Sequence, residues 1–136
     1  FGGELSKNGC FVGSHAVVIL SDKDNIADVA LNLVSFFKHE SCGQCTPCRE
    51  GSGWMWRMLE RMRKNEASRE EIDMLEEVTK QIEGHTICAF GEGSSWPVQG
   101  LLRHFKKEII KRNNFNPVVS VNKNIPYLVD QHLLDK

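Results

Sequence analysis

The sequence predicts a mainly α-helical fold, a small four-helix bundle. Four segments place apolar residues at every third or fourth position, short connections separate them, and most have a helix-capping or helix-ending signal. At 136 residues, of which 40% are apolar, the chain is long enough for one modest core and too short for two large nucleotide-binding domains. We therefore expect one helical domain with less regular segments at its edges.

The first helix is predicted over residues 25–37, with Asp24 or Ser21 as its N-terminal cap. Its apolar positions share one helical face. They are Ile26, Val29, Ala30, Leu33, Val34 and Phe37. Before this helix, residues 15–20 are typical of a buried strand, and Ser21 and Asp22 supply the turn that follows.

The second helix is predicted from about Arg49 to Lys64, after Gly43 and Pro47 interrupt the periodicity. The third begins at a capping box formed by Ser68 and Glu71, in which the serine hydroxyl and the glutamate satisfy unpaired amide groups reciprocally. It should end near Gly84, because glycine commonly follows the last helical residue.

A glycine- and serine-rich loop is predicted from Phe90 to Ser95, and Pro97 then fits the opening turn of a fourth helix. Its apolar face is formed by Val98, Leu101, Leu102, Phe105 and Ile109. Residues 113–136 contain two prolines and no clean periodicity, and we expect them to form an extended tail.

Charge and hydropathy exclude several classes of partner. The 17 basic and 18 acidic residues nearly cancel and form no block of one sign, which predicts neither a nucleic-acid-binding face nor a polybasic membrane anchor. The longest strictly apolar run, Ala16 to Leu20, is far shorter than the roughly 20 residues of a membrane span, so no direct span is expected. Five cysteines, three of them close together, suit a metal site in a reducing compartment better than a disulfide framework.

Three of these cysteines, Cys42, Cys45 and Cys48, follow the spacing Cys-x2-Cys-x2-Cys on a segment with the turn residues Gly43 and Pro47. On an α-helix each three-residue step falls short of a full 3.6-residue turn, so the thiols would not converge. We therefore expect a loop that curls around an inorganic cluster and offers a sulfur to three of its corners.

Cys88 is the expected fourth ligand, since no other cysteine follows the triple. It lies just past the third predicted helix, and an antiparallel helix pair that starts at the cysteine loop would return the chain beside that loop. Cys10 has no spacing relation to the others and is interpreted as a small buried hydrophobe. His85 is a reserve ligand, and Arg49 is either a donor toward the cluster or a solvated surface residue.

Two other interpretations of the four cysteines stay open at this point. One is a structural zinc site, although zinc is usually bound by two separated pairs of Cys or His ligands and not by three closely spaced cysteines with one distant cysteine. The other is a dithiol redox pair, because the triple contains two Cys-x-x-Cys motifs, although no βαβ pattern surrounds them.

Two longer sequence blocks contain these cysteines. Residues 38–51 read KHESCGQCTPCREG, and residues 81–89, QIEGHTICA, are followed by WPVQGL at 96–101. In this order the blocks resemble the flavoprotein 1 subunit of respiratory complex I, the NADH:ubiquinone oxidoreductase, over roughly Val12 to Arg112.

The resemblance implies one [4Fe-4S] cluster in a helical domain formed by residues 23–112. Its ligands would be Cys42, Cys45, Cys48 and Cys88. It also implies that residues 1–22 are the end of a ubiquitin-like β-grasp domain and contribute its last strand. Residues 113–136 match no pattern of this family.

In this family NADH reduces a flavin mononucleotide, FMN, on an N-terminal Rossmann-like domain, and the cluster passes electrons one at a time toward ubiquinone. The resemblance therefore implies an electron relay within a proton-translocating NADH:ubiquinone reductase. No residue of this chain corresponds to the N-terminal domain, so the NADH and FMN sites are expected on a missing part or a partner chain.

The implied partners are the large iron–sulfur subunit, flavoprotein 2 and the flavin-binding part of flavoprotein 1. The implied location is the matrix side of the mitochondrial inner membrane, or the cytoplasmic side in a bacterium. The equivalent subunits of NAD-linked hydrogenases and formate dehydrogenases share the cluster motif and are the alternatives.

Overall fold

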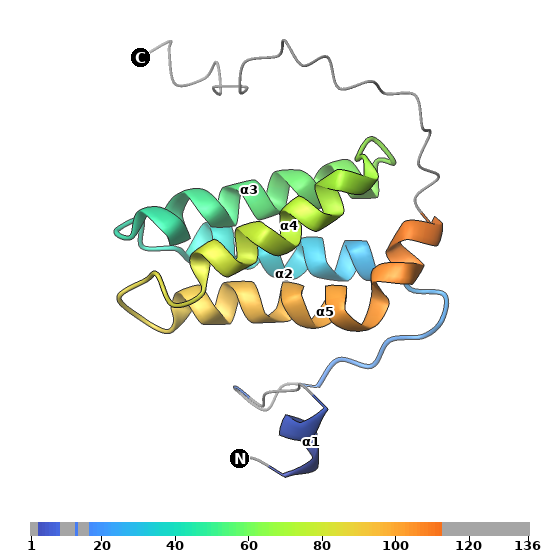
Figure 1. The fold of residues 1–136 in the computed structure, drawn as a ribbon, viewed down its shortest axis with the longest axis horizontal. Coiled ribbons are helices and arrows are strands. Elements are labelled where there is room, and N and C mark those ends of the chain that lie inside the picture. The colour runs from blue at the N-terminus through green and yellow to red at the C-terminus, as the bar shows by residue number, and fades with distance from the viewer. Residues whose placement is uncertain (1–2, 9–12, 14–16, 113–136) are drawn as a thin grey trace.

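The computed structural model describes residues 3–8, 13 and 17–112 (Figure 1). Over these residues the chain contains helices and no strand, which confirms the prediction of a mainly α-helical fold. A one-turn helix, α1, spans Glu4–Lys7. The four long helices are α2 (Ile26–Glu40), α3 (Thr46–Arg63), α4 (Arg69–Ile82) and α5 (Phe90–Arg112).

The four long helices form a bundle in which each packs against the next. Helix α2 packs on α3 and α5, and α4 packs on the same two helices from the other side. Because short connections join successive helices, neighbours run antiparallel. The connections at 41–45 and 83–89 therefore lie at one end of the bundle, and the connection at 64–68 lies at the other (Figure 1).

The core lies between these four helices and draws on all of them. Its most deeply buried apolar side chains are Val34, Met55, Leu59, Met62, Ile72, Leu75, Ile82 and Val98. Leu33 and Phe105, predicted on apolar faces, are each 37% exposed, and Trp54 is 53% exposed. None of the described helices is both long and apolar enough to cross a bilayer.

Helices α2 and α4 begin where the sequence predicts, but the prediction of Asp24 or Ser21 as the cap of α2 is wrong. The Asn25 side chain caps α2 by accepting the Ala27 N–H at 3.0 Å, while Asp24 instead accepts the Ser21 N–H and closes the preceding turn. The predicted capping box of Ser68 and Glu71 is present at the start of α4.

Helix α3 begins at Thr46, earlier than the predicted Arg49. Pro47 lies in its first turn, where the N–H that proline lacks would have no intrahelical partner, so this proline starts the helix and does not interrupt it. Cys45 is the N-cap, and Cys48 lies inside the first turn. The prediction that all three closely spaced cysteines lie in a loop is therefore wrong for Cys48.

Helix α5 begins at Phe90, so the predicted loop from Phe90 to Ser95 is helical and Pro97 lies inside the helix. Ser94 and Ser95 are fully buried, and their hydroxyls donate to the Gly91 carbonyl at 2.8 and 3.0 Å. Buried serines can therefore sit in this helix without an unpaired hydroxyl. Pro97 removes one backbone hydrogen bond, a local cost that the surrounding packing overrides.

The predicted buried strand at residues 15–20 is not observed where the structure describes the chain, which is from Val17 onward. Residues 17–20 have no regular secondary structure, and Val17, Val18 and Ile19 are 79%, 74% and 86% exposed. A strand needs a neighbour to satisfy its backbone hydrogen bonds, and the described residues provide none.

The junction of α4 and α5 is held by two carboxylates. Trp96 Nε1 and Gln99 Nε2 donate to the two carboxylate oxygens of Glu83 at 2.6 and 2.9 Å. The hydrogen bond from Gln99, followed by that from Trp96, lowers the pKa of Glu83 below its usual range. The Gly84 N–H donates to Glu92 Oε1 at 2.9 Å, which anchors the chain where it leaves α4.

Replacing Leu75 by alanine should lower the free energy of unfolding by about 2–5 kcal/mol, because truncating a fully buried leucine leaves a cavity. The adjacent Met74 is 53% exposed, so Met74→Ala is a matched control that should change the free energy of unfolding by less than about 0.5 kcal/mol. Denaturant unfolding followed by circular dichroism measures both. Equal effects of the two substitutions would contradict the observed core.

Glu83→Gln should flatten the pH dependence of stability in acid. Folding lowers the pKa of Glu83. The contribution of this carboxylate to the free energy of unfolding is therefore fully present above the ordinary glutamate pKa of about 4.3, and it is lost as the pH falls through the folded-state pKa. The variant lacks this titration, so its free energy of unfolding should be lower near neutrality and fall less steeply with acid. Urea unfolding at a series of pH values measures the slope, and parallel profiles would refute the assignment.

Candidate metal centre

Two connections and the adjoining first turn of α3, all at the same end of the bundle, contain the four predicted ligands (Figure 1). The α2–α3 connection supplies Cys42 and Cys45, the first turn of α3 supplies Cys48, and the α4–α5 connection supplies Cys88. All four are free thiols. The two connections touch, because the Ile87 N–H donates to Cys45 Sγ at 3.5 Å across 42 positions of sequence.

The four thiols differ in their exposure to solvent. Cys42 and Cys88 are exposed, Cys45 is half-buried, and Cys48 is 7% exposed. Cys48 also has a polar neighbour, since Ser41 Oγ lies 3.3 Å from its sulfur. The site is therefore open on the side of Cys42 and Cys88 and closed against the bundle at Cys48.

Arg49 reaches back from α3 and holds the α2–α3 connection. Its Nη1 donates to the carbonyls of Gly43 and Gln44 at 2.9 and 3.4 Å, and its Nε pairs with Glu50 at 2.7 Å. Gly43 has a φ of +79°, a left-handed conformation that glycine adopts without strain, and its N–H donates to Ser41 Oγ. The guanidinium thus contacts the loop backbone, an arrangement that neither sequence-based interpretation of Arg49 anticipated.

The connection that bears Cys88 is held by its own backbone and by α5. The Thr86 hydroxyl donates to the Cys88 carbonyl at 2.9 Å. Gly91 packs so closely against Thr86 that a Cβ at position 91 would collide with the threonine side chain. His85 Nδ1 lies 2.8 Å from the Glu83 carbonyl, so one ring nitrogen of this reserve ligand is already engaged with the backbone.

Aromatic contacts close the same end of the bundle. The rings of Phe37 and Phe90 meet edge to face, with their centroids 5.4 Å apart, and join the end of α2 to the start of α5. Lys38 Nζ lies 4.0 Å above the ring of Trp56, a cation–π contact between α2 and α3. These contacts support the helix ends from which both cysteine connections emerge.

The donor set consists of four sulfur atoms, the ligand type that holds an iron–sulfur cluster. Among the described residues, no three His, Cys, Asp or Glu side chains converge closely enough to hold one metal ion. A [4Fe-4S] cluster does not need such convergence, because each thiolate binds a different iron at its own corner. Four soft sulfur donors, three from two adjoining connections and Cys48 from the first turn of α3, are compatible with that arrangement.

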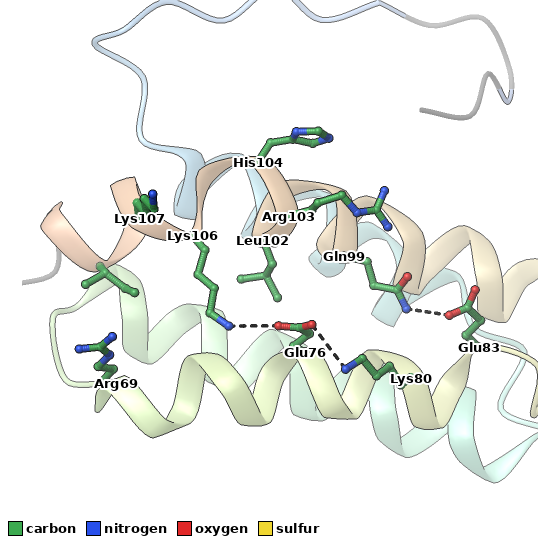
Figure 2. Close-up of a pocket in the computed structure, with 11 residues that line it drawn as sticks. Arg69, Glu76, Lys80, Glu83, Gln99, Leu102, Arg103, His104, Lys106 and Lys107 are labelled. Carbon is green, nitrogen blue, oxygen red and sulfur yellow. Dashed lines mark hydrogen bonds and ion pairs between the residues drawn. The ribbon is translucent and has the colours of Figure 1, made fainter. Parts of the chain in front are cut away.

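A separate groove of about 740 Å³ runs between α4 and α5, and none of the described cysteines lines it (Figure 2). Within it, Glu76 lies 3.1 Å from Lys106 Nζ and 3.4 Å from Lys80 Nζ, and the hydrogen bond from Lys106 lowers the pKa of Glu76. At its other end Glu83 accepts from Gln99. The carboxylates of this groove therefore already pair with side chains that line it.

Sequence reasoning missed two groups that contact the predicted ligands. Ser41 is the C-cap of α2 and lies beyond the end of the helix predicted over residues 25–37, so its sequence position indicates no contact with a ligand. The contact from Ile87 is made by its backbone N–H, which every residue except proline provides. Neither contact leaves a residue-type or spacing signal in the sequence.

Residues 28–112 match the family described as the NADH-ubiquinone oxidoreductase-F iron-sulfur binding region. An NADH-quinone oxidoreductase subunit of Rhizobium meliloti (strain 1021) is 53% identical over 108 residues, which cover 79% of this chain and 25% of that protein. The mitochondrial NADH-ubiquinone oxidoreductase 51 kDa subunit of Aspergillus niger is 54% identical over 101 residues, which cover 74% of this chain and 20% of that protein.

Two crystal structures of an NAD+-reducing [NiFe]-hydrogenase, air-oxidized and H2-reduced, resemble the fold with TM-scores of 0.65 and 0.64 at 27% sequence identity. Each comparison covers 68% of this chain and 16% of the hydrogenase chain. The chain thus spans about a quarter or less of the relatives that it matches. Because the family match covers more than half of the chain, this protein belongs to the family of NADH-ubiquinone oxidoreductase F iron–sulfur binding regions.

Proposed function

We propose that this chain binds one [4Fe-4S] cluster and relays electrons within an NADH-quinone oxidoreductase. The proposed ligands are the thiolates of Cys42, Cys45, Cys48 and Cys88. The observation that supports this most directly is the hydrogen bond from Ile87 to Cys45, which joins the two cysteine connections at one end of the bundle. Membership of an iron–sulfur binding family supports the nature of the bound group.

The bound cluster supplies a one-electron redox centre. The chain's own residues hold and orient the thiols: Arg49 fixes the loop before α3, and Thr86 fixes the backbone at Cys88. The bundle shields one side, where Cys48 is buried. Cys42 and Cys88 lie on the exposed side, which we propose faces an adjoining redox partner.

The proposed electron path begins at an FMN reduced by NADH, both bound outside the residues described above. It continues through this chain to the large iron–sulfur subunit and finally to quinone. Flavoprotein 2 and the flavin-binding part of flavoprotein 1 are the other proposed neighbours. The relatives support this assignment, because they are subunits of a bacterial NADH-quinone oxidoreductase and of a mitochondrial NADH-ubiquinone oxidoreductase. The proposed location is the matrix side of the mitochondrial inner membrane, with the bacterial cytoplasmic side as the alternative.

We further propose that residues 1–22 end a β-grasp domain, that residues 23–112 form the cluster-binding domain, and that residues 113–136 form a tail. The exposed apolar side chains of Val17 and Ile19 support the first assignment, because strand-forming residues without a neighbouring strand suit a missing sheet. Residues 113–136 lie outside the described residues.

The equivalent subunit of an NAD-linked hydrogenase is the second candidate, and the structural likeness to such an enzyme favours it. Sequence identity favours the quinone reductases, at 53% and 54% against 27% for the hydrogenase. We therefore retain the quinone-linked assignment.

The chain, purified anaerobically, should contain about four iron atoms and four acid-labile sulfides and give an electron paramagnetic resonance (EPR) signal of a reduced [4Fe-4S] cluster after dithionite treatment. Metal analysis, sulfide analysis and EPR spectroscopy measure these. Stoichiometric zinc without sulfide in a folded, colourless protein would refute the relay and support a structural zinc site.

Cys88→Ser should lose or convert the cluster while the helix content stays close to that of the wild type, because Cys88 is exposed and lies outside the core. Iron and sulfide content, with far-ultraviolet circular dichroism, measure the two effects. Cys10→Ser is the matched control and should keep the full iron content, since Cys10 is not among the proposed ligands. Unchanged iron in Cys88→Ser would remove Cys88 from the ligand set.

A further inference from the structure

Ser41 is placed to act on one of the proposed ligands. Its hydroxyl oxygen lies 3.3 Å from Cys48 Sγ, although the two residues belong to different elements, the end of α2 and the first turn of α3. We propose that Ser41 is a positioning residue whose hydroxyl donates a hydrogen bond to the Cys48 thiolate and thereby raises the reduction potential of the bound cluster. This inference rests on the proposed function.

The direction of the hydrogen bond follows from the thiolate state that Cys48 has as a cluster ligand, and the other partner of the hydroxyl is compatible with it. The Gly43 N–H donates to Ser41 Oγ at 3.3 Å, and an amide N–H can only donate. The oxygen is therefore an acceptor toward Gly43, and its own proton is left to point elsewhere. Cys48 Sγ is the neighbour in reach, and a thiolate has no proton to give.

The backbone around Ser41 holds the hydroxyl beside Cys48. Ser41 is the C-cap of α2, and its N–H donates to the Phe37 carbonyl at 3.1 Å. Two residues later, Gly43 turns the chain with a φ of +79°, and its N–H lies within hydrogen-bonding distance of the serine oxygen. The hydroxyl is thus fixed between a helix end and a glycine turn, which limits the entropy lost on forming the bond.

Because Cys48 is buried, a hydrogen bond stabilises negative charge on its sulfur more than it would on the exposed sulfurs of Cys42 and Cys88. Cys48 is 7% exposed, whereas Cys42 and Cys88 are exposed to water. A negative sulfur with little access to water depends on protein donors for its stabilisation. One-electron reduction adds negative charge to the cluster and its sulfur ligands, so a donor at Cys48 stabilises the reduced form more than the oxidised form. Removing the donor should lower the reduction potential.

The test is a redox titration of the whole 136-residue chain, purified anaerobically with its cluster and followed by EPR spectroscopy against the applied potential. Ser41→Ala should have a more negative midpoint potential, so that its reduced fraction at the wild-type midpoint falls several-fold, with unchanged iron and sulfide content. Ser41→Thr keeps the hydroxyl and should restore the wild-type midpoint.

Thr46→Val is the matched control. It removes an exposed hydroxyl from the same region, one that contacts Arg49 and no thiol, and should leave the midpoint unchanged. A shift in Thr46→Val equal to that in Ser41→Ala would overturn the inference.

Equal midpoints for the wild type and Ser41→Ala would overturn the inference and leave the cluster assignment intact. Loss of iron from Ser41→Ala while Ser41→Thr retains it would also overturn it, because the hydroxyl would then serve to assemble the site and not to set its potential. A wild-type chain without iron and sulfide would instead contradict the proposed function itself.

Discussion

Burial of one apolar core between four antiparallel helices determines where the two cysteine connections meet. Side chains from every long helix, such as Val34, Met55, Leu75 and Val98, share that core. Because neighbouring helices run antiparallel, residues 41–45 and 83–89 emerge at the same end (Figure 1). Neither connection has regular secondary structure that would position its thiols alone, so their relative position depends on the packing of the helices.

Polar contacts then give each connection a defined shape. On the α3 side, Arg49 binds the backbone carbonyls of the loop that follows Cys42. On the α4 side, Glu83 and Glu92 hold the point where the chain leaves the helix. Ligands on loops lose less entropy when they bind a group if neighbouring side chains have already fixed the backbone. These side chains support the backbone that bears the proposed ligands, and they are not ligands themselves.

Pro47 and Pro97 show that tertiary structure can change what a proline indicates about the local backbone. Pro47 reads as a helix breaker in the sequence, yet in the first turn of α3 its missing N–H costs nothing. Pro97 is typical of the start of a helix, yet α5 begins at Phe90, and the buried Ser94 and Ser95 donate their hydroxyl protons to a carbonyl within that helix. In both cases the deciding quantity is which backbone and hydroxyl groups find a partner, and residue type alone does not reveal it.

The sequence by itself determined the four helices and the candidate ligands. The apolar periodicity predicts most of the buried positions of each helix, although Leu33 and Phe105 are 37% exposed, and the spacing of Cys42, Cys45 and Cys48 is a local property of the chain. Only the tertiary structure decided that the Ile87 amide reaches Cys45 and that Ser41 lies beside Cys48. The reason is physical: these contacts use a backbone N–H and a common hydroxyl, brought into reach by helix packing, and neither has a sequence pattern of its own.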